Sequence, residues 1–86
     1  MSALALSFPA LQIADGVNPF DANVLDEWAA GPCSHGEKCL ARFILAVWSP
    51  GEEWKSGKFD FMESYQIWSD NHRRAFSAWA RDPWWP

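Results

Sequence analysis

The chain has 86 residues and a net charge of −4, so it is long enough for one small domain whose core area is scarce. Its seven Trp, six Phe and one Tyr can supply large buried areas per residue in place of many aliphatic side chains. No segment concentrates the positive charge that binding to a phosphate backbone requires, which argues against nucleic acid as a partner.

The apolar segments favour neither export nor membrane insertion. Residues 1–9 are apolar, but they lack the positive residues that begin a signal peptide. Residues 40–48 contain Arg42 and fall far short of the ~20 residues that a membrane-spanning helix requires. Two cysteines, Cys33 and Cys39, do not make the disulfide framework of small secreted domains. We therefore expect a cytoplasmic protein that has no membrane partner.

Residues 1–17 are expected to form an irregular arm. Leu4, Leu6 and Phe8 alternate with small residues, which hints at an extended segment, but a lone strand is not stable without a partner. Pro9 obstructs the continuation of a helix. We expect the Leu and Phe side chains of the arm to lie across the helices of the core. The alternative is a frayed, disordered start.

The helical core is predicted over residues 18–82, and its first helix covers about 19–30. Asn18 is a suitable cap for the free amide groups, and Pro19 fits the first helical position. Gly31 and the proline after it end this helix, and the glycine is expected in the left-handed cap conformation.

A second helix is predicted from Gly36 or Glu37 to Trp48. Ser34 and Glu37 have the spacing of a capping box, in which each side chain bonds the backbone amide of the other residue. Because the helix is apolar on nearly all sides, it is expected in the middle of a bundle. One short helical turn is expected near 51–55, and a loop follows it.

The third helix is predicted over 59–81, ending before Pro83, since a residue that precedes proline avoids the helical region. On a helical wheel, one sector roughly 100° wide carries the apolar side chains of this segment. The members of that aromatic face are Phe61, Tyr65, Trp68, His72, Ala75, Phe76 and Trp79. The predicted fold is therefore a small all-α domain of three main helices plus a short helical turn, closed by a tail over 83–86.

The densest group of reactive side chains is Cys33, His35 and Cys39, to which His72 could add a fourth zinc ligand. Their spacing matches neither the two-residue nor the four-residue gap of common zinc sites. A thiol nucleophile is the other chemical alternative, because a cysteine near a helix N-terminus can have a lowered pKa and His35 lies nearby. Nothing in the sequence places an Asp or Asn to orient that histidine. We expect no metal, no cofactor and no catalysis, with Cys39 acting as a small buried hydrophobe.

Three residues are the candidates for contact with a partner. His72 lies at the centre of the aromatic face, where it is either a ligand contact and pH-sensitive group or a neutral histidine at the edge of the core. Trp84 and Trp85 lie between two prolines, and they are either an exposed anchor for a partner or a cover over the gap between helices.

These observations lead to one functional hypothesis with two alternatives. The leading hypothesis is a small non-enzymatic protein-interaction module that binds a protein partner or forms a homodimer. The first alternative is a metal- or thiol-dependent protein that uses the Cys33, His35 and Cys39 cluster. The second makes the acidic N-terminal part, with Asp21, Asp26 and Glu27, a decoy for a nucleic-acid-binding protein.

Overall fold

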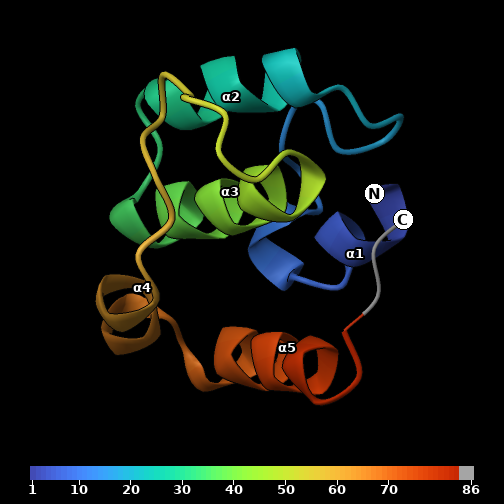
Figure 1. Ribbon diagram of the computed structural model, residues 1–86, viewed down its shortest axis with the longest axis vertical. Coiled ribbons are helices and arrows are strands. Elements are labelled where there is room, and N and C mark those ends of the chain that lie inside the picture. The colour runs from blue at the N-terminus through green and yellow to red at the C-terminus, as the bar shows by residue number, and fades with distance from the viewer. Residues whose placement is uncertain (84–86) are drawn as a thin grey trace.

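The fold is a bundle of short helices around one central helix, seen in a computed structural model that describes residues 1–83 (Figure 1). No strand occurs in these residues, so the predicted all-α class is confirmed. No helix in the same range is long and apolar enough to cross a bilayer. The elements in chain order are α1 (Ser2–Leu6), the 3-10 helix η1 (Pro9–Leu11), α2 (Ala22–Ala30), α3 (His35–Trp48), α4 (Phe61–Ile67) and α5 (Asp70–Arg81).

Helix α3 lies at the centre, with α2 on one side of it, α1 and η1 on a second, and α4 and α5 on a third (Figure 1). Its apolar circumference explains this position, because only a helix surrounded by neighbours can bury side chains on every side. The predicted capping box is present: the Ser34 hydroxyl accepts from the Glu37 amide at 3.1 Å, and the Glu37 carboxylate accepts from the Ser34 amide at 2.8 Å. The buried side chains of α3 are Cys39, Leu40, Ala41, Phe43, Ile44, Leu45 and Val47.

The N-terminal arm is more helical than predicted, because it contains α1 and η1. Pro9 starts η1, where its missing amide proton removes no helical hydrogen bond. The expected packing is confirmed, since Leu4, Phe8 and Leu11 are fully buried. The Phe8 ring lies edge-on to the ring of Phe43 on α3, with 5.6 Å between the centroids. The arm is therefore part of the core.

Helix α2 begins at Ala22, about three residues later than predicted. The Asn18–Pro19 peptide bond is cis, and the chain reaches the helix only after a turn. The cap is Asp21, whose carboxylate accepts from the amides of Asn23 and Val24. The prediction that Asn18 is the cap is therefore wrong, although an acidic side chain at the helix start suits the macrodipole.

The other end of α2 also differs from the prediction. Gly31 has a φ of −84° and an extended backbone, so it is not a left-handed cap. The Lys38 ammonium on α3 instead donates to the carbonyl oxygens of Ala29 at 2.6 Å and Gly31 at 2.7 Å. A cation at this position satisfies helix-end carbonyls and complements the negative end of the helix dipole.

The predicted helix over 59–81 is two helices, so the prediction of one continuous helix is wrong. Trp68 has an extended ψ of 142°, and Ser69 is the N-cap residue of α5. This break turns the Trp68 side chain into the core, where it is 3% exposed and its ring lies 5.9 Å from Phe59 and 5.6 Å from Phe76. Burial of the indole compensates for the interrupted helical hydrogen bonds.

Residues 51–55 are not helical, contrary to the prediction. They begin within a turn in which the Glu52 amide donates to the Ser49 carbonyl, and they continue as a loop that crosses to α4. A buried carboxylate on α2 holds this loop: Asp26 accepts from the amides of Lys55 at 3.1 Å and Ser56 at 2.9 Å. The loop is thus held by hydrogen bonds to Asp26 on α2, and not by hydrogen bonds within a helix.

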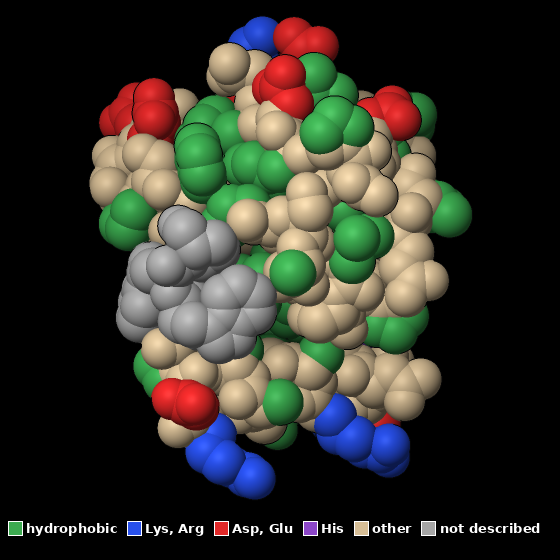
Figure 2. Space-filling model, turned by 90° about the vertical axis from the view of Figure 1, so that its right-hand side faces the viewer, with side chains coloured by type: hydrophobic (Ala, Val, Ile, Leu, Met, Phe, Trp, Pro, Cys, Tyr) green, Lys and Arg blue, Asp and Glu red, His purple; other side chains and the backbone are tan. Residues whose placement is uncertain are grey.

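Charge is unevenly distributed over the surface. Figure 2 shows one face, on which most acidic side chains gather toward the α2 end and basic side chains gather at the α5 end. The acidic N-terminal part exposes less negative charge than the sequence indicates, because Asp26 is only 6% exposed. The Asp21 carboxylate caps α2.

Candidate functional site

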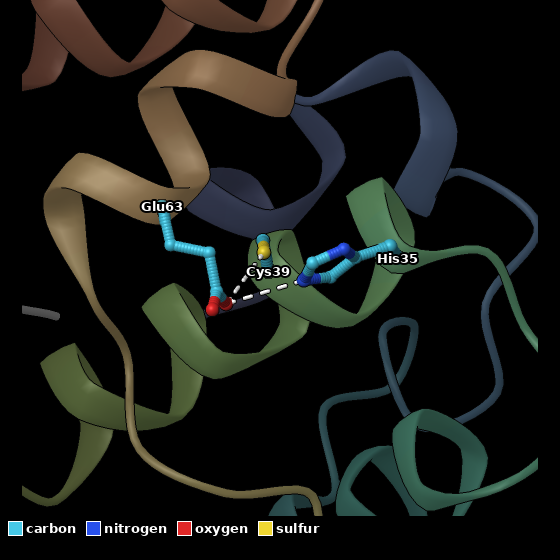
Figure 3. Close-up of side chains that lie close together, drawn as sticks. All are labelled: His35, Cys39 and Glu63. Atoms are coloured by element: carbon cyan, nitrogen blue, oxygen red, sulfur yellow. Dashed lines mark hydrogen bonds and ion pairs between the residues drawn. The ribbon is translucent and has the colours of Figure 1, made fainter.

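His35, Cys39 and Glu63 form a tight group of metal-ligating side chains at the junction of α3 and α4 (Figure 3). His35 and Cys39 are one turn apart on α3, so they project from the same face of that helix. Glu63 comes from the first turn of α4, which Asp60 fixes by accepting from the Glu63 amide at 2.9 Å. Three donor atoms of these side chains lie within 4.8 Å of one another.

One carboxylate oxygen is the centre of the group. Glu63 Oε1 lies 3.2 Å from His35 Nε2 and 3.7 Å from Cys39 Sγ. The Arg42 Nη1 atom donates to the same oxygen at 3.1 Å. Arg42 is itself fixed, because its Nε atom donates to the Ser56 carbonyl at 2.6 Å. The group therefore combines three candidate ligands with one guanidinium that does not belong to the ligand set.

The environment of Cys39 keeps its thiol protonated. Burial raises the pKa of the thiol, and the negative charge of Glu63 raises it further. The Ser64 hydroxyl and the Arg42 guanidinium act in the opposite direction on this pKa, but they do not cancel the rise. The sulfur donates to the Glu63 carboxylate in this state. A buried thiol with a raised pKa is poorly suited to nucleophilic attack, which argues against the thiol-enzyme alternative.

Ser64 adds an unusual polar group beside the sulfur. Its side chain is fully buried, and its hydroxyl makes no hydrogen bond of ordinary geometry within the described residues. It is nevertheless close enough to Cys39 to lower the pKa of the thiol, as a donor to a thiolate does. Burying a hydroxyl is costly unless it is hydrogen-bonded.

The structure separates the other two residues of the sequence-based metal set from this group. The Cys33 sulfur lies 3.6 Å from the carbonyl oxygens of Trp28 and Ala29, at the end of α2. Both Cys33 and Cys39 are free thiols. His72 lies on α5, where it contacts the N-terminal arm.

The geometry around His72 is that of a neutral imidazole. Its Nε2 atom accepts from the Ala10 amide at 3.2 Å, and its Nδ1 atom lies 2.9 Å from the Ser69 hydroxyl. The ring stacks on Phe8 with 6.5 Å between the centroids, and burial lowers the pKa of His72. These contacts join the arm to α5. The other two partner candidates, Trp84 and Trp85, lie outside the described residues.

Sequence reasoning missed Glu63 and Arg42 as members of the site. Neither residue was connected with the Cys and His cluster from the sequence. Glu63 is 24 residues from Cys39, so no local spacing pattern connects the two. The available signal was the Asp60-to-Glu63 cap, which fixes where α4 starts and therefore where Glu63 projects.

A second feature of α4 is a set of exposed large apolar side chains. Phe61, Met62 and Tyr65 are 45%, 65% and 37% exposed, and they lie on one side of the helix. The Phe61 ring contacts the rings of Tyr65 and Phe76, each with 5.4 Å between centroids. We call Phe61, Met62, Tyr65 and Phe76 the α4 apolar surface. Ile67 is also exposed, but it lies on another side of α4, near Gly36.

A shallow groove of about 270 Å³ continues this surface beyond Phe76. All of the side chains that line it are apolar: Phe43, Ala46, Val47, Pro50, Phe59, Phe76 and Trp79. The group of metal-ligating side chains and the α4 apolar surface therefore both include residues of α4, where Glu63 follows Met62 in the chain.

In comparisons with known proteins, no family model, no curated protein and no solved structure matches this chain.

Proposed function

We propose that this protein is a small non-enzymatic interaction module that binds an apolar helix of a partner protein on the α4 apolar surface. The observation that carries the proposal is the exposure of three neighbouring large apolar side chains on one two-turn helix. Single exposed hydrophobic residues are normal on a monomer, whereas the largest contiguous apolar patch is often a functional surface. The apolar groove beyond Phe76 extends that group toward α3.

The area of the surface selects a helix as the occupant. At about 200 Å² for a fully exposed side chain, the exposed parts of Phe61, Met62 and Tyr65 amount to roughly 300 Å². A standard interface between two folded proteins takes about 800 Å² from each partner. A second copy of this chain would need much more surface than α4 offers. One amphipathic helix, which inserts a few apolar side chains into a groove, matches the available area.

The chemistry of the described residues favours binding over catalysis. Cys39 is buried and has a raised pKa, and the His72 nitrogens are occupied by Ala10 and Ser69. The guanidinium of Arg73 lies over the Tyr65 ring at 4.8 Å from its centroid, which fixes the ring at the edge of the surface. Tyrosine and arginine are both enriched among binding hot spots.

The test uses a phage-displayed library of amphipathic helical peptides selected against the full chain. Met62→Gln removes the most exposed apolar side chain of the surface while it keeps a good helix former at that position. We expect selected peptides to bind Met62→Gln about tenfold more weakly than the wild type. Ser77→Gln, at an exposed polar position of α5, is the matched control and should bind as the wild type does.

Two results would overturn the proposal. One is a selection in which every enriched peptide binds Met62→Gln as tightly as the wild type. The other is a concentration-dependent dimer in sedimentation that Met62→Gln abolishes, because the surface would then belong to a second copy of the chain. Circular dichroism of each variant shows whether its helices are intact.

A further inference from the structure

We propose that His35, Cys39 and Glu63 bind one divalent ion of the zinc class, at the junction between α3 and α4. This set differs from the one considered from the sequence, because Glu63 replaces Cys33 and His72. The inference does not depend on the α4 apolar surface. Metal binding would give these three side chains a function, whereas binding of a partner protein on the α4 apolar surface gives them none.

The donor types match a borderline-soft cation. Zinc in proteins takes imidazole nitrogen, thiolate sulfur and carboxylate oxygen in a tetrahedral arrangement, and three protein ligands leave one position for water. Magnesium and calcium prefer oxygen ligands alone, so the sulfur of Cys39 disfavours them. The imidazole of His35 is exposed at the surface, which gives an ion access to the site.

The distances are close to those of an assembled site. Zinc–ligand bonds of about 2.0 to 2.3 Å in a tetrahedron place neighbouring donor atoms roughly 3.3 to 3.6 Å apart. Two of the three donor pairs are near this range, with 3.2 Å from His35 Nε2 to Glu63 Oε1 and 3.7 Å from Cys39 Sγ to that oxygen. The third pair, His35 Nε2 and Cys39 Sγ, is within 4.8 Å, and the exposed His35 side chain has room to move.

The ligands supply negative charge for a divalent ion. A thiolate and a carboxylate carry two negative charges, while His35 binds as neutral imidazole. The Arg42 guanidinium beside Glu63 adds one positive charge outside the ligand set. The proton of the Cys39 thiol leaves to solvent as the sulfur–metal bond forms, and no oxidation or reduction takes place. In the metal-free state the Cys39 thiol donates to the Glu63 carboxylate. In the metal-bound state the ion would contact this carboxylate instead.

The side chains behind the ligands are also suitable. Arg42 donates to the Glu63 carboxylate and is held by the Ser56 carbonyl, so it orients the carboxylate as an outer-shell partner. The buried Ser64 hydroxyl lacks an ordinary hydrogen-bond partner in the described residues and lies beside the Cys39 sulfur. A metal-bound thiolate is a stronger acceptor for this hydroxyl than the protonated thiol is.

The experiment is a calorimetric titration of zinc chloride into the reduced full chain free of any affinity tag. We expect one equivalent of zinc to bind. Titration with cobalt chloride should produce thiolate-to-cobalt charge-transfer absorption, which reports the sulfur ligand directly. Millimolar magnesium should not displace either ion.

Surface variants keep the test decisive even where Cys39→Ser fails to fold. His35→Ala and Glu63→Gln change partly exposed side chains, and each should weaken zinc binding about tenfold or more. Cys33→Ser is the matched control, since this cysteine lies at the end of α2, and it should bind zinc as the wild type does. Absence of binding heat and of charge-transfer absorption in the wild type would overturn the proposal. Unchanged zinc affinity in His35→Ala together with Glu63→Gln would do the same.

Discussion

The carboxylate of Asp26 on α2 and the backbone and side chain of Ser56 make two short hydrogen bonds inside the protein. Asp26 Oδ1 accepts from the Ser56 amide at 2.9 Å and from its hydroxyl at 2.8 Å. Oδ2 accepts from the Lys55 amide at 3.1 Å, so both oxygens are occupied. Together with the Arg42 Nε atom, which donates to the Ser56 carbonyl at 2.6 Å, this contact anchors the loop between α3 and α4.

Replacing this carboxylate should destabilise the whole domain. We expect Asp26→Asn to lower the free energy of unfolding by about 2 to 3 kcal/mol, because an amide has one acceptor atom where the carboxylate has two. The control is Glu27→Gln, whose exposed side chain lies 3.9 Å from Lys55 and should change stability by about 0.5 kcal/mol at most. Urea unfolding followed by tryptophan fluorescence measures both. Equal effects of the two variants would contradict the anchoring role.

The N-terminal arm should contribute as much to stability as a core helix does. Phe8 is fully buried against Phe43, so Phe8→Ala is expected to cost about 3 to 5 kcal/mol. Ile13→Ala in the same arm is the comparison, since Ile13 is 82% exposed and should change stability by about 0.5 kcal/mol or less. The unfolding temperatures of the two variants give the measurement. A much lower unfolding temperature for Phe8→Ala indicates that the arm is part of the core. Similar unfolding temperatures for both variants would contradict the packing.

Two glycines with the same backbone conformation should differ in their response to alanine. Gly16 and Gly51 have φ values of +83° and +87°, so a side chain is strained at either position. At Gly16 a Cβ atom would also lie 2.5 Å from the Leu25 amide nitrogen, whereas at Gly51 nothing lies within 4 Å. We expect Gly51→Ala to cost about 1 kcal/mol and Gly16→Ala clearly more. Chemical denaturation of both gives the difference, which isolates the clash from the strain that they share.

Stability should fall in mild acid because of His72. Its pKa lies below the usual value near 6.5, so the folded state favours the neutral ring that accepts from the Ala10 amide. The stabilisation is complete above the unfolded pKa and is lost as the pH falls through the folded pKa. We expect the unfolding free energy of the wild type to decrease from pH 7.5 to 5.5. His72→Gln should show a flatter profile, and a wild-type slope in His72→Gln would disprove the assignment.

Local signals in the sequence predicted the parts of the fold that depend on neighbouring residues. The Ser34–Glu37 capping box was predictable because its hydrogen bonds connect groups three positions apart. The break at Trp68 was not, because the helical phase of the aromatic face runs across it without interruption. Whether an indole stays on a helix face or ends the helix to enter the core depends on Phe59 and Phe76, which lie outside any one turn.

The candidate site was half predictable for the same reason. His35 and Cys39 share a helix, so their proximity follows from their spacing. Glu63 joins them only because the loop held by Asp26 brings α4 against α3, and that contact connects residues far apart in the chain. Asp26 itself was counted among the surface acids, since a charged residue carries no sequence mark of burial when its partners are distant backbone amides.

Lys38 also determines how the protein opens transiently. Its ammonium on α3 holds the last carbonyls of α2, so α2 cannot fray from that end without releasing a cation of the neighbouring helix. Helix α5 has no fully buried residue. In native-state hydrogen exchange, the amides of α2 and α3 should therefore exchange as one cooperative unit with the highest opening free energy. The amides of α5 should exchange earlier, as a separate unit, and Lys38→Met should bring α2 closer to that behaviour.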